Sequence, residues 1–356
     1  MTPKTIRIWS WLHKWSSLIC TVFMLLLCLT GLPLIFHHEL GHALGNIPEA
    51  PPLKAGQVPR LVTLDEAVAI ARKQYPDRVP QFASADEESD DLWYVTMTPS
   101  PEPTDDFKVV SVDARTGDFL GVPPINSGLL WIMFKLHVDL FAGLAGKLFL
   151  GLMGVLLVVS LVSGTVLYAP FMRKLDFGTV RQGDARRSRP AQRRLKWLDL
   201  HNLLGIVLLA WLTVVGATGV LNTWADLLIK YWQFDQLAAI MAPYKDQPAL
   251  PIEERASIHR AYEAAKEAAP QTRMGFMAFP GTAFSSPHHY TFFMRGNTPI
   301  TSQLLQPVLV DAGTAQVTAT PRLPWYLAAL LMFRPLHFGD YGGLSMQILW
   351  ALLDVL

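Results

Sequence analysis

Cysteine is almost absent from this chain of 356 residues. Cys20 and Cys28 both lie in one apolar run, so the sequence has no disulfide framework, no C-x-x-C motif and no C-x-x-C-H motif for covalent haem attachment. An excess of either charge is also missing, because 30 lysines and arginines against 29 aspartates and glutamates leave a net charge of +1. This balance argues against nucleic acid as a partner, since a polyanion favours a clearly basic protein.

Long apolar segments are what the chain does have. Hydrophobic residues make up 51% of the sequence, and a bilayer of roughly 30 Å needs about 20 apolar residues to cross it. Four candidate segments lie at 16–36, at 147–171, at 203–224 and from Tyr341 to Leu356. The last one stops within its apolar run, so we expect the native helix to be longer. The lipid bilayer is therefore the first expected partner.

Basic residues predict the orientation in the membrane. The stretch between the second and third segments contains these lysines and arginines: Arg173, Lys174, Arg181, Arg186, Arg187, Arg189, Arg193, Arg194 and Lys196. Lys4, Arg7 and Lys14 add positive charge near the N-terminus. Because cytoplasmic loops carry an excess of Lys and Arg, we expect both regions in the cytoplasm. The long stretches 38–128 and 225–330 are then expected on the other side.

An internal repeat organises the chain. The segment "WSWLHKWSSLICTVFMLLLCLTG", 9–31, aligns with "WLDLHNLLGIVLLAWLTVVGATG", 197–219, at an offset of 188. The alignment matches His13 with His201, and both segments end in Thr-Gly.

Two further anchors support the repeat. "LHVDLFAGL" at 136 aligns with "LHFGDYGGL" at 336, which matches His137 with His337 at an offset of 200. "VDARTGDFLG" at 112 aligns with "VDAGTAQVTA" at 310 at an offset of 198. Three anchors with nearly constant offsets predict two copies of one helix–domain–helix unit.

Each long stretch between apolar segments is expected to form a helix followed by a small antiparallel sheet. In the first, "TLDEAVAIARKQYP" contains a capping box of Thr63 and Glu66, and "LWYVTMT", "FKVVSVD" and "DFLG" are strand-like. In the second, "IEERASIHRAYEAAKEAAP" is helical in pattern, and "GFMAFP", "HHYTFFMR" and "QPVLVDAGTAQV" are strand-like.

The predicted fold class is an α-helical membrane bundle of four transmembrane helices in two pseudo-symmetric repeats, with two small α+β domains. The expected parts are a cytoplasmic N-terminus with the first span at 1–36, an outer domain at 37–128, an interfacial helix with the second span at 129–171, a basic cytoplasmic loop at 172–196, the third span at 197–224, a second outer domain at 225–330, and an interfacial segment with the fourth span at 331–356.

The sequence resembles the PepSY-associated transmembrane proteins, which are iron-regulated proteins of the bacterial inner membrane. The matching stretches are "WLHKWSSLICTVFMLLLCLTG", "LHVDLFAGLAGKLFLGLMG" with "LVSGTVL", "LHNLLGIVLLAWLTVVGATG" and the PepSY-like "VSVDARTGDFLG". The resemblance covers nearly the whole chain and implies that both outer domains are PepSY-like and periplasmic. Some members of the family are haem-containing reductases of ferric siderophores, so it also implies an oxidoreductase.

The repeat singles out four of the ten histidines. His13 and His201 are expected at the cytoplasmic ends of their spans, and His137 and His337 at the outer ends. Ligating residues at membrane depth are costly and usually functional. A pseudo-twofold axis would bring each pair face to face, and two facing imidazoles suit the iron of a non-covalent haem b. We therefore predict two bis-histidine haems, with interfacial histidines that reach toward water as the alternative.

The remaining predictions concern the neighbours of these haems and the reaction. Basic side chains are expected to meet the haem propionates: Lys14, Arg194 and Lys196 on the inside, Lys135 and Arg334 on the outside. A cytoplasmic donor or a quinol would supply electrons, and the acceptor would be a ferric siderophore of hydroxamate type. One electron would loosen the chelate, since hard oxygen ligands prefer Fe(III) to Fe(II). The alternative is a non-redox PepSY module that binds a membrane protease or transporter.

One short motif matches a different class of protein, the zinc proteases. His38-Glu39-Leu40-Gly41-His42 matches the H-E-x-x-H pattern of zinc proteases. A third zinc ligand is not evident, proline-rich chain follows, and the repeat copy "VLNTWADLL" has no histidine pair. We therefore expect no protease. His37, His38 and His42 are instead candidate substrate-side residues; the alternatives are that one of them replaces an expected haem ligand, or that all three are plain interfacial residues.

Other histidines and the tryptophans are assigned structural roles. His259, His288 and His289 are expected on a surface or in a strand, with the adjacent pair pointing to opposite faces. The expected interface anchors are Trp131, Trp224, Trp232 and Trp325.

Overall fold

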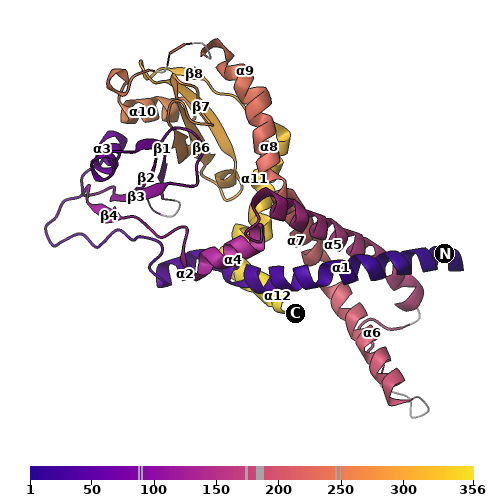
Figure 1. The fold of residues 1–356 in the computed structure, drawn as a ribbon. Helices are drawn as coiled ribbons and strands as arrows, with labels where there is room; N and C mark the ends of the chain where they lie inside the picture. Colours follow the sequence, from indigo (N-terminus) through magenta and orange to yellow (C-terminus); the bar gives the residue numbers. More distant parts are fainter. Residues whose placement is uncertain (87–88, 90, 173–174, 182–187, 245–246, 249) are drawn as a thin grey trace. The chain divides into compact units, whose positions relative to one another are not determined.

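The computed structural model describes residues 1–356 apart from 87–88, 90, 173–174, 182–187, 245–246 and 249. The chain forms two compact units (Figure 1). The helical unit comprises Met1–His37, Leu129–Ala225 and Phe333–Leu356, and the sheet unit comprises His38–Gly128 and Asp226–Met332. Each unit is thus assembled from stretches that are far apart in the sequence.

The helical unit is built around α1 and α5. Its helices are α1 (Pro3–Ile35), α4 (Gly128–Val138), α5 (Gly143–Met172), α6 (Arg189–Val207), α7 (Leu209–Thr223), the end of α11 (Trp325–Phe338) and α12 (Gly343–Val355). Helix α5 packs against α1 and α7. A Cβ on Gly154 of α5 would lie 2.8 Å from Val220 of α7. Small residues therefore allow these helices to approach closely, as in membrane proteins.

Among the described residues, two helices are long and apolar enough to cross a bilayer: α1 over Pro3–Ile35 and α5 over Gly143–Pro170. Helices α6 and α7 pass the same test together if they count as one span, although they are bent by 66° at the break between them. Helix α1 also exposes an apolar stripe at helical spacing. Its members are 60–70% exposed: Leu18, Val22, Leu25 and Leu29. Lipid is the natural cover for such a stripe.

The third and fourth expected spans differ from simple straight helices. The third begins at Arg189, well before residue 197, and changes direction at Leu208. The fourth is represented by α12, which has 13 residues. In the basic loop, Arg181 is not free, because its guanidinium donates to the buried carboxylate of Asp199 at 2.6 and 3.0 Å.

Part of that basic loop lies outside the described residues. The loop lysines and arginines concerned are Arg173, Lys174, Arg186 and Arg187.

The sheet unit contains one antiparallel sheet of eight strands among the described residues. They are β1 (Val79–Ala85), β2 (Leu92–Thr98), β3 (Lys108–Asp113), β4 (Phe119–Gly121), β5 (Thr272–Ala278), β6 (His289–Gly296), β7 (Leu305–Asp311) and β8 (Val317–Ala319). Their order is β4-β3-β2-β1-β5-β6-β7-β8. Each half is a meander, and β1 pairs with β5 through Phe82↔Ala278, Ala83↔Met277 and Ser84↔Phe276. The two expected outer domains thus share a single sheet.

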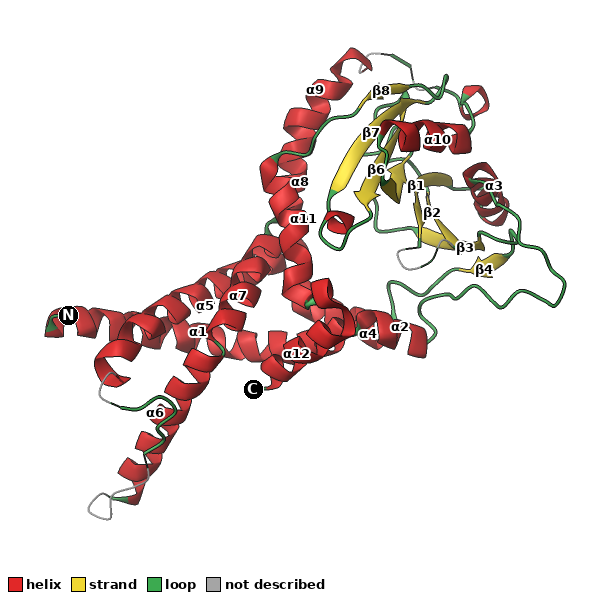
Figure 2. Cartoon of the chain, turned by 180° about the vertical axis from the view of Figure 1, so that it is seen from behind, coloured by secondary structure: helices red, strands yellow, loops and turns green. Residues whose placement is uncertain are grey.

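One hydrophobic core serves both halves of this sheet. Helices α3 (Leu64–Gln74) and α10 (Ile258–Ala268) pack on the strands (Figure 2) and contribute Ala67, Ala261 and Ala265 to the same cluster as Met97 and Phe292. The predicted capping box at the start of α3 is confirmed, since the side chain of Thr63 accepts from the Glu66 amide and Glu66 accepts from the Thr63 amide.

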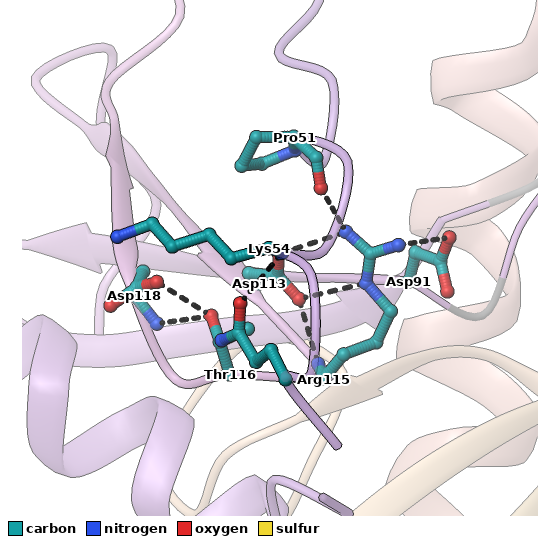
Figure 3. A network of polar contacts seen from close by, with 8 residues as sticks. Pro51, Lys54, Asp91, Asp113, Arg115, Thr116 and Asp118 are labelled. Atoms are coloured by element: carbon teal, nitrogen blue, oxygen red, sulfur yellow. Dashed lines mark hydrogen bonds and ion pairs between the residues drawn. The ribbon is translucent and has the colours of Figure 1, made fainter. Parts of the chain in front are cut away.

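The repeated "VDA" motif has a structural role. Asp113 ends β3, and Arg115 donates to both of its carboxylate oxygens, to the Pro51 carbonyl and to Asp91 (Figure 3). Burial would raise the pKa of the Asp113 carboxyl, but the hydrogen bonds and charge of Arg115 outweigh it and hold that pKa below its ordinary value. Asp113 also accepts from the Arg115 amide, and in the second copy Asp311 accepts from the equivalent Gly313 amide and from the Thr314 amide.

Short helices complete the sheet unit and correct one expectation. They are α2 (His37–Ala43), α8 (Ala225–Trp232), the π-helix Gln233–Leu237, α9 (Ala238–Met241) and the 3-10 turns Ala242–Tyr244, Ile252–Glu254 and Thr301–Gln303. Trp232 was expected as an interface anchor, but it is 2% exposed and its ring lies 6.3 Å from that of Phe293. It is a core residue, whereas Trp325 is 81% exposed.

Candidate functional site

The helical unit brings the four repeat-matched histidines together in two pairs. His13 of α1 faces His201 of α6, with ring centroids 6.0 Å apart and ring planes at 55°. His137 of α4 faces His337 of α11, with centroids 6.1 Å apart and planes at 62°. The two pairs have nearly the same spacing although they are built from four different helices.

This spacing fits one metal ion between two imidazoles. Metal–imidazole bonds are about 2 Å long, and a ring centroid lies about 1 Å behind its ligating nitrogen, so two ligands on opposite sides of an ion have centroids about 6 Å apart. Direct packing of two rings is also compatible with 6 Å, so the spacing fits a metal ion without requiring one.

Within the part of the chain that the structure describes, the Nδ1 atoms of His13, His137 and His337 each meet a backbone carbonyl. His13 Nδ1 lies 3.0 Å from the Ser160 carbonyl, and His337 Nδ1 lies 3.0 Å from the Val215 carbonyl. The Leu27 carbonyl plays the same part for His137. A carbonyl can only accept, so each Nδ1 must carry the proton and donate. The Nε2 atom then keeps its lone pair, which is the state that a metal ligand needs.

Glycines allow neighbouring helices to approach these rings. A Cβ on Gly31 would lie 2.9 Å from Cε1 of His137, and one on Gly219 would lie 3.2 Å from Cε1 of His337. Gly31 and Gly219 are the matched ends of the two repeat segments. Gly164 stands in the same relation to His13, at 3.0 Å. The positions of these three rings therefore depend on glycine, which has no side chain, at the facing position of the neighbouring helix.

The two pairs differ in exposure. His13, His137 and His337 are half-buried, whereas His201 is exposed.

The basic residues predicted to meet haem propionates have varied surroundings. Lys135 forms an ion pair with Asp139, so its charge is already partly balanced. The ammonium of Lys14 lies 5.4 Å from the ring centroid of Trp15. Arg194 lines an open groove of about 620 Å³ with Arg189, Pro190, Arg193 and Trp197. Lys196 and Arg334 are exposed.

The H-E-x-x-H stretch forms the seven-residue helix α2. The rings of His38 and His42 lie 4.6 Å apart, but His42 Nδ1 is 2.7 Å from the carboxylate of Glu49. Within the described part of the chain, no group of three or more His, Cys, Asp or Glu side chains is placed to hold a metal ion. His37 Nδ1 lies 3.0 Å from the Leu34 carbonyl.

Among the histidines of the second half of the sheet, His289 lies in a strand as expected, but the expected alternation of His288 and His289 across a strand is wrong. His289 begins β6, while His288 lies in the preceding turn, so strand alternation does not separate them. Their rings lie 4.3 and 6.3 Å from that of Tyr244. His289 is fully buried, and its Nδ1 is 2.6 Å from the hydroxyl of Ser286.

Sequence reasoning missed the residues that hold the histidines. The hydroxyls of Thr30, Thr218 and Ser163 and the three glycines beside the rings were assigned no role. The repeated Thr-Gly ending of the two aligned segments was the signal that could have found four of them.

Comparison with known proteins identifies the family of the chain. The family described as "PepSY-associated TM region" matches residues 10–356. A Pseudomonas aeruginosa protein described as uncharacterized, PA4219, is 34% identical over 91 residues, which is 26% of this chain and 21% of that relative. Because the family match covers nearly the full length, the chain belongs to the family of proteins with a PepSY-associated transmembrane region.

Proposed function

We propose that this protein is a two-haem electron-transfer protein of the bacterial inner membrane that reduces ferric siderophores on the periplasmic side. The proposal includes four spans in two pseudo-symmetric repeats, with the N-terminus and the 172–196 loop in the cytoplasm. It also places the sheet unit, with its two PepSY-like halves, in the periplasm.

The observation that carries the proposal is the double pairing of histidines in the helical unit. Both pairs have a spacing of about 6 Å, and three rings donate through Nδ1, which leaves Nε2 free. A chance meeting of helix-end histidines would not require matched spacing or a shared tautomer. Non-covalent binding also suits a chain whose two cysteines offer no attachment motif.

The roles of the chain's own residues follow from this arrangement. His13 and His201 would hold the cytoplasmic haem, and His137 and His337 the periplasmic one. Gly31, Gly164 and Gly219 keep room for the rings, and the apolar helices exclude water. Exposed Lys14, Arg194, Lys196 and Arg334 are available to propionates, and Lys135 would have to share its charge with Asp139.

Haem b, when bound, supplies reversible one-electron exchange at its iron. The reaction needs one electron for each ferric ion, which a quinol or a cytoplasmic reductant supplies, and it yields Fe(II). Hydroxamate oxygens hold Fe(II) less firmly than Fe(III), so the ion is released without cleavage of the siderophore. No protein nucleophile or general base is required.

The proposal is tested by stopped-flow spectroscopy of the purified, reduced protein mixed with a ferric hydroxamate siderophore. We expect the haem absorbance to change from the reduced to the oxidised form as Fe(II) appears in a ferrous chelator. His137→Ala and His337→Ala should stop this transfer, while Glu39→Ala should not, because Glu39 has no part in it. A protease with the H-E-x-x-H motif would show the reverse pattern.

Two outcomes would overturn the proposal. A protein that stays colourless when produced with ample haem would favour the non-redox PepSY module instead. If the protein binds haem but no ferric siderophore reoxidises it, the proposed substrate is wrong.

A further inference from the structure

Each engaged histidine contacts the same three-residue pattern on a neighbouring helix. The pattern is a backbone carbonyl at position i, a side-chain hydroxyl at i+3 and a glycine at i+4. The three sets are Leu27, Thr30 and Gly31 around His137; Val215, Thr218 and Gly219 around His337; and Ser160, Ser163 and Gly164 around His13.

The hydroxyl in each set is oriented by its own helix. Thr30 donates to the Leu26 carbonyl at 2.7 Å, and Thr218 donates to the Val214 carbonyl at 2.6 Å. Ser163 donates in the same way to Val159 at 2.7 Å. A hydroxyl has one proton, so its oxygen can only accept from the histidine.

The hydroxyl distances agree with this assignment. The distance from Nδ1 to the hydroxyl oxygen is 3.1 Å for His137 and Thr30, 3.2 Å for His337 and Thr218, and 3.2 Å for His13 and Ser163. Each Nδ1–H therefore meets two acceptors, one carbonyl and one hydroxyl, on the same helical turn. The glycine one residue later leaves space for the ring to reach them.

We propose that these carbonyl–hydroxyl–glycine sets are imidazole cradles, in which Thr30, Thr218 and Ser163 are positioning residues that fix the histidine tautomer and lower the reduction potential of the iron it ligates. This inference rests on the proposed function for its redox part. Hydrogen bonds from Nδ1–H make the imidazole a stronger electron donor through Nε2, and a stronger donor favours Fe(III) over Fe(II). The hydroxyl adds to this effect beyond what the carbonyl alone provides.

The cradle has two separable tests. In haem-free protein with ¹⁵N-labelled histidine, the nitrogen chemical shifts should show protonated Nδ1 and unprotonated Nε2 for His13, His137 and His337. Signals are assigned by replacing one histidine at a time with Gln. Protonated Nε2 at these rings would overturn the cradle, and this result does not depend on whether haem binds.

The second test measures redox potential in the haem-loaded protein. Thr30→Val should raise the midpoint potential of the haem held by His137. It should also weaken haem binding about 10-fold, since loss of a hydrogen-bond partner of a ligating histidine typically lowers metal affinity by about 10- to 100-fold. Thr30→Ser retains the hydroxyl and should behave like the parent. Thr213→Val is the matched control, because Thr213 also donates to its i−4 carbonyl but contacts no cradle histidine in the hydrogen bonds of the described residues.

The outcomes distinguish the two proposals. Absence of haem in the parent protein would refute the proposed function and leave the tautomer test standing. A midpoint potential that is unchanged or lowered in Thr30→Val, with the parent value retained in Thr213→Val, would overturn the tuning role of the cradle.

Discussion

Replacing Gly31 with alanine adds one methyl group beside His137. The new Cβ would lie 2.9 Å from Cε1 of the ring, whereas ordinary contacts begin at 3.4 Å. The ring or the helix must therefore move by about 0.5 Å. The ring moves more easily, since α1 is held by its packing on α5, so the displacement falls on the histidine and its facing partner.

The size of this displacement decides the expected effect. Metal sites hold their ligand distances to within about 0.2 Å, so a shift of about 0.5 Å is too large to leave the iron coordinated as before. Alanine also favours a helix by about 1 kcal/mol over glycine, which offsets part of the steric cost to the fold. We therefore expect Gly31→Ala to lose one haem while the protein stays folded. Gly219→Ala, with its contact at 3.2 Å, should lose less.

Haem content per chain, measured by pyridine haemochrome together with circular dichroism, gives the readout. Gly205→Ala is the matched control, because Gly205 lies in α6 and a Cβ there meets nothing within 4 Å. It should retain the parent haem content and helicity. Full haem content in Gly31→Ala, or equal loss in Gly205→Ala, would refute the role assigned to the glycine.

Three further predictions concern stability, pH and topology. In urea unfolding, Arg115→Met should lower the free energy of unfolding by about 2 kcal/mol. Loss of a fully buried ion pair costs roughly 3–5 kcal/mol, and the cost is smaller here because the Arg115 side chain is 20% exposed. Arg60→Met, at an exposed ion pair, is the control and should cost under about 1 kcal/mol. Burial acts to raise the pKa of Asp311, but hydrogen bonds led by those from Thr314 hold it below its ordinary value. Its stabilisation is therefore present above the unfolded pKa of about 3.9 and lost as pH falls through the folded pKa, and Asp311→Asn should flatten this acid limb. Reporter fusions at residue 180 should read cytoplasmic and those at residue 270 periplasmic; the opposite result would invert the assigned sides of both histidine pairs.

The fold was predictable where the sequence repeats or alternates. The strand-like run "LWYVTMT" is β2 over Leu92–Thr98, and the capping box at Thr63 begins α3. Strand β1, "VPQFASA", was missed because it contains a proline and polar residues and lacks a clear alternation. Its pairing with β5 could not be predicted either, since register between distant strands depends on contacts that leave no local pattern.

The four histidines of the site could be predicted from the sequence, but the hydroxyl and glycine residues that surround them could not all be predicted. Matched offsets identified the pairs, because a duplicated helix start carries its histidine with it. The cradles depend on which helix packs beside which ring, and that choice is made by tertiary packing. The prediction of Trp232 as an interface anchor was wrong for the same reason. Trp232 follows an apolar segment in the sequence, but tertiary packing places its ring against Phe293.

The central claim is that facing histidines hold two haems, and the haem content of single and double histidine variants tests it most directly. The parent should contain two haems per chain with low-spin spectra. His137→Ala, His337→Ala and the double variant should each contain one, because both residues hold the same haem. His13→Ala and His201→Ala should likewise each remove the other haem. Unchanged haem content and spectra in all four single variants would contradict the account.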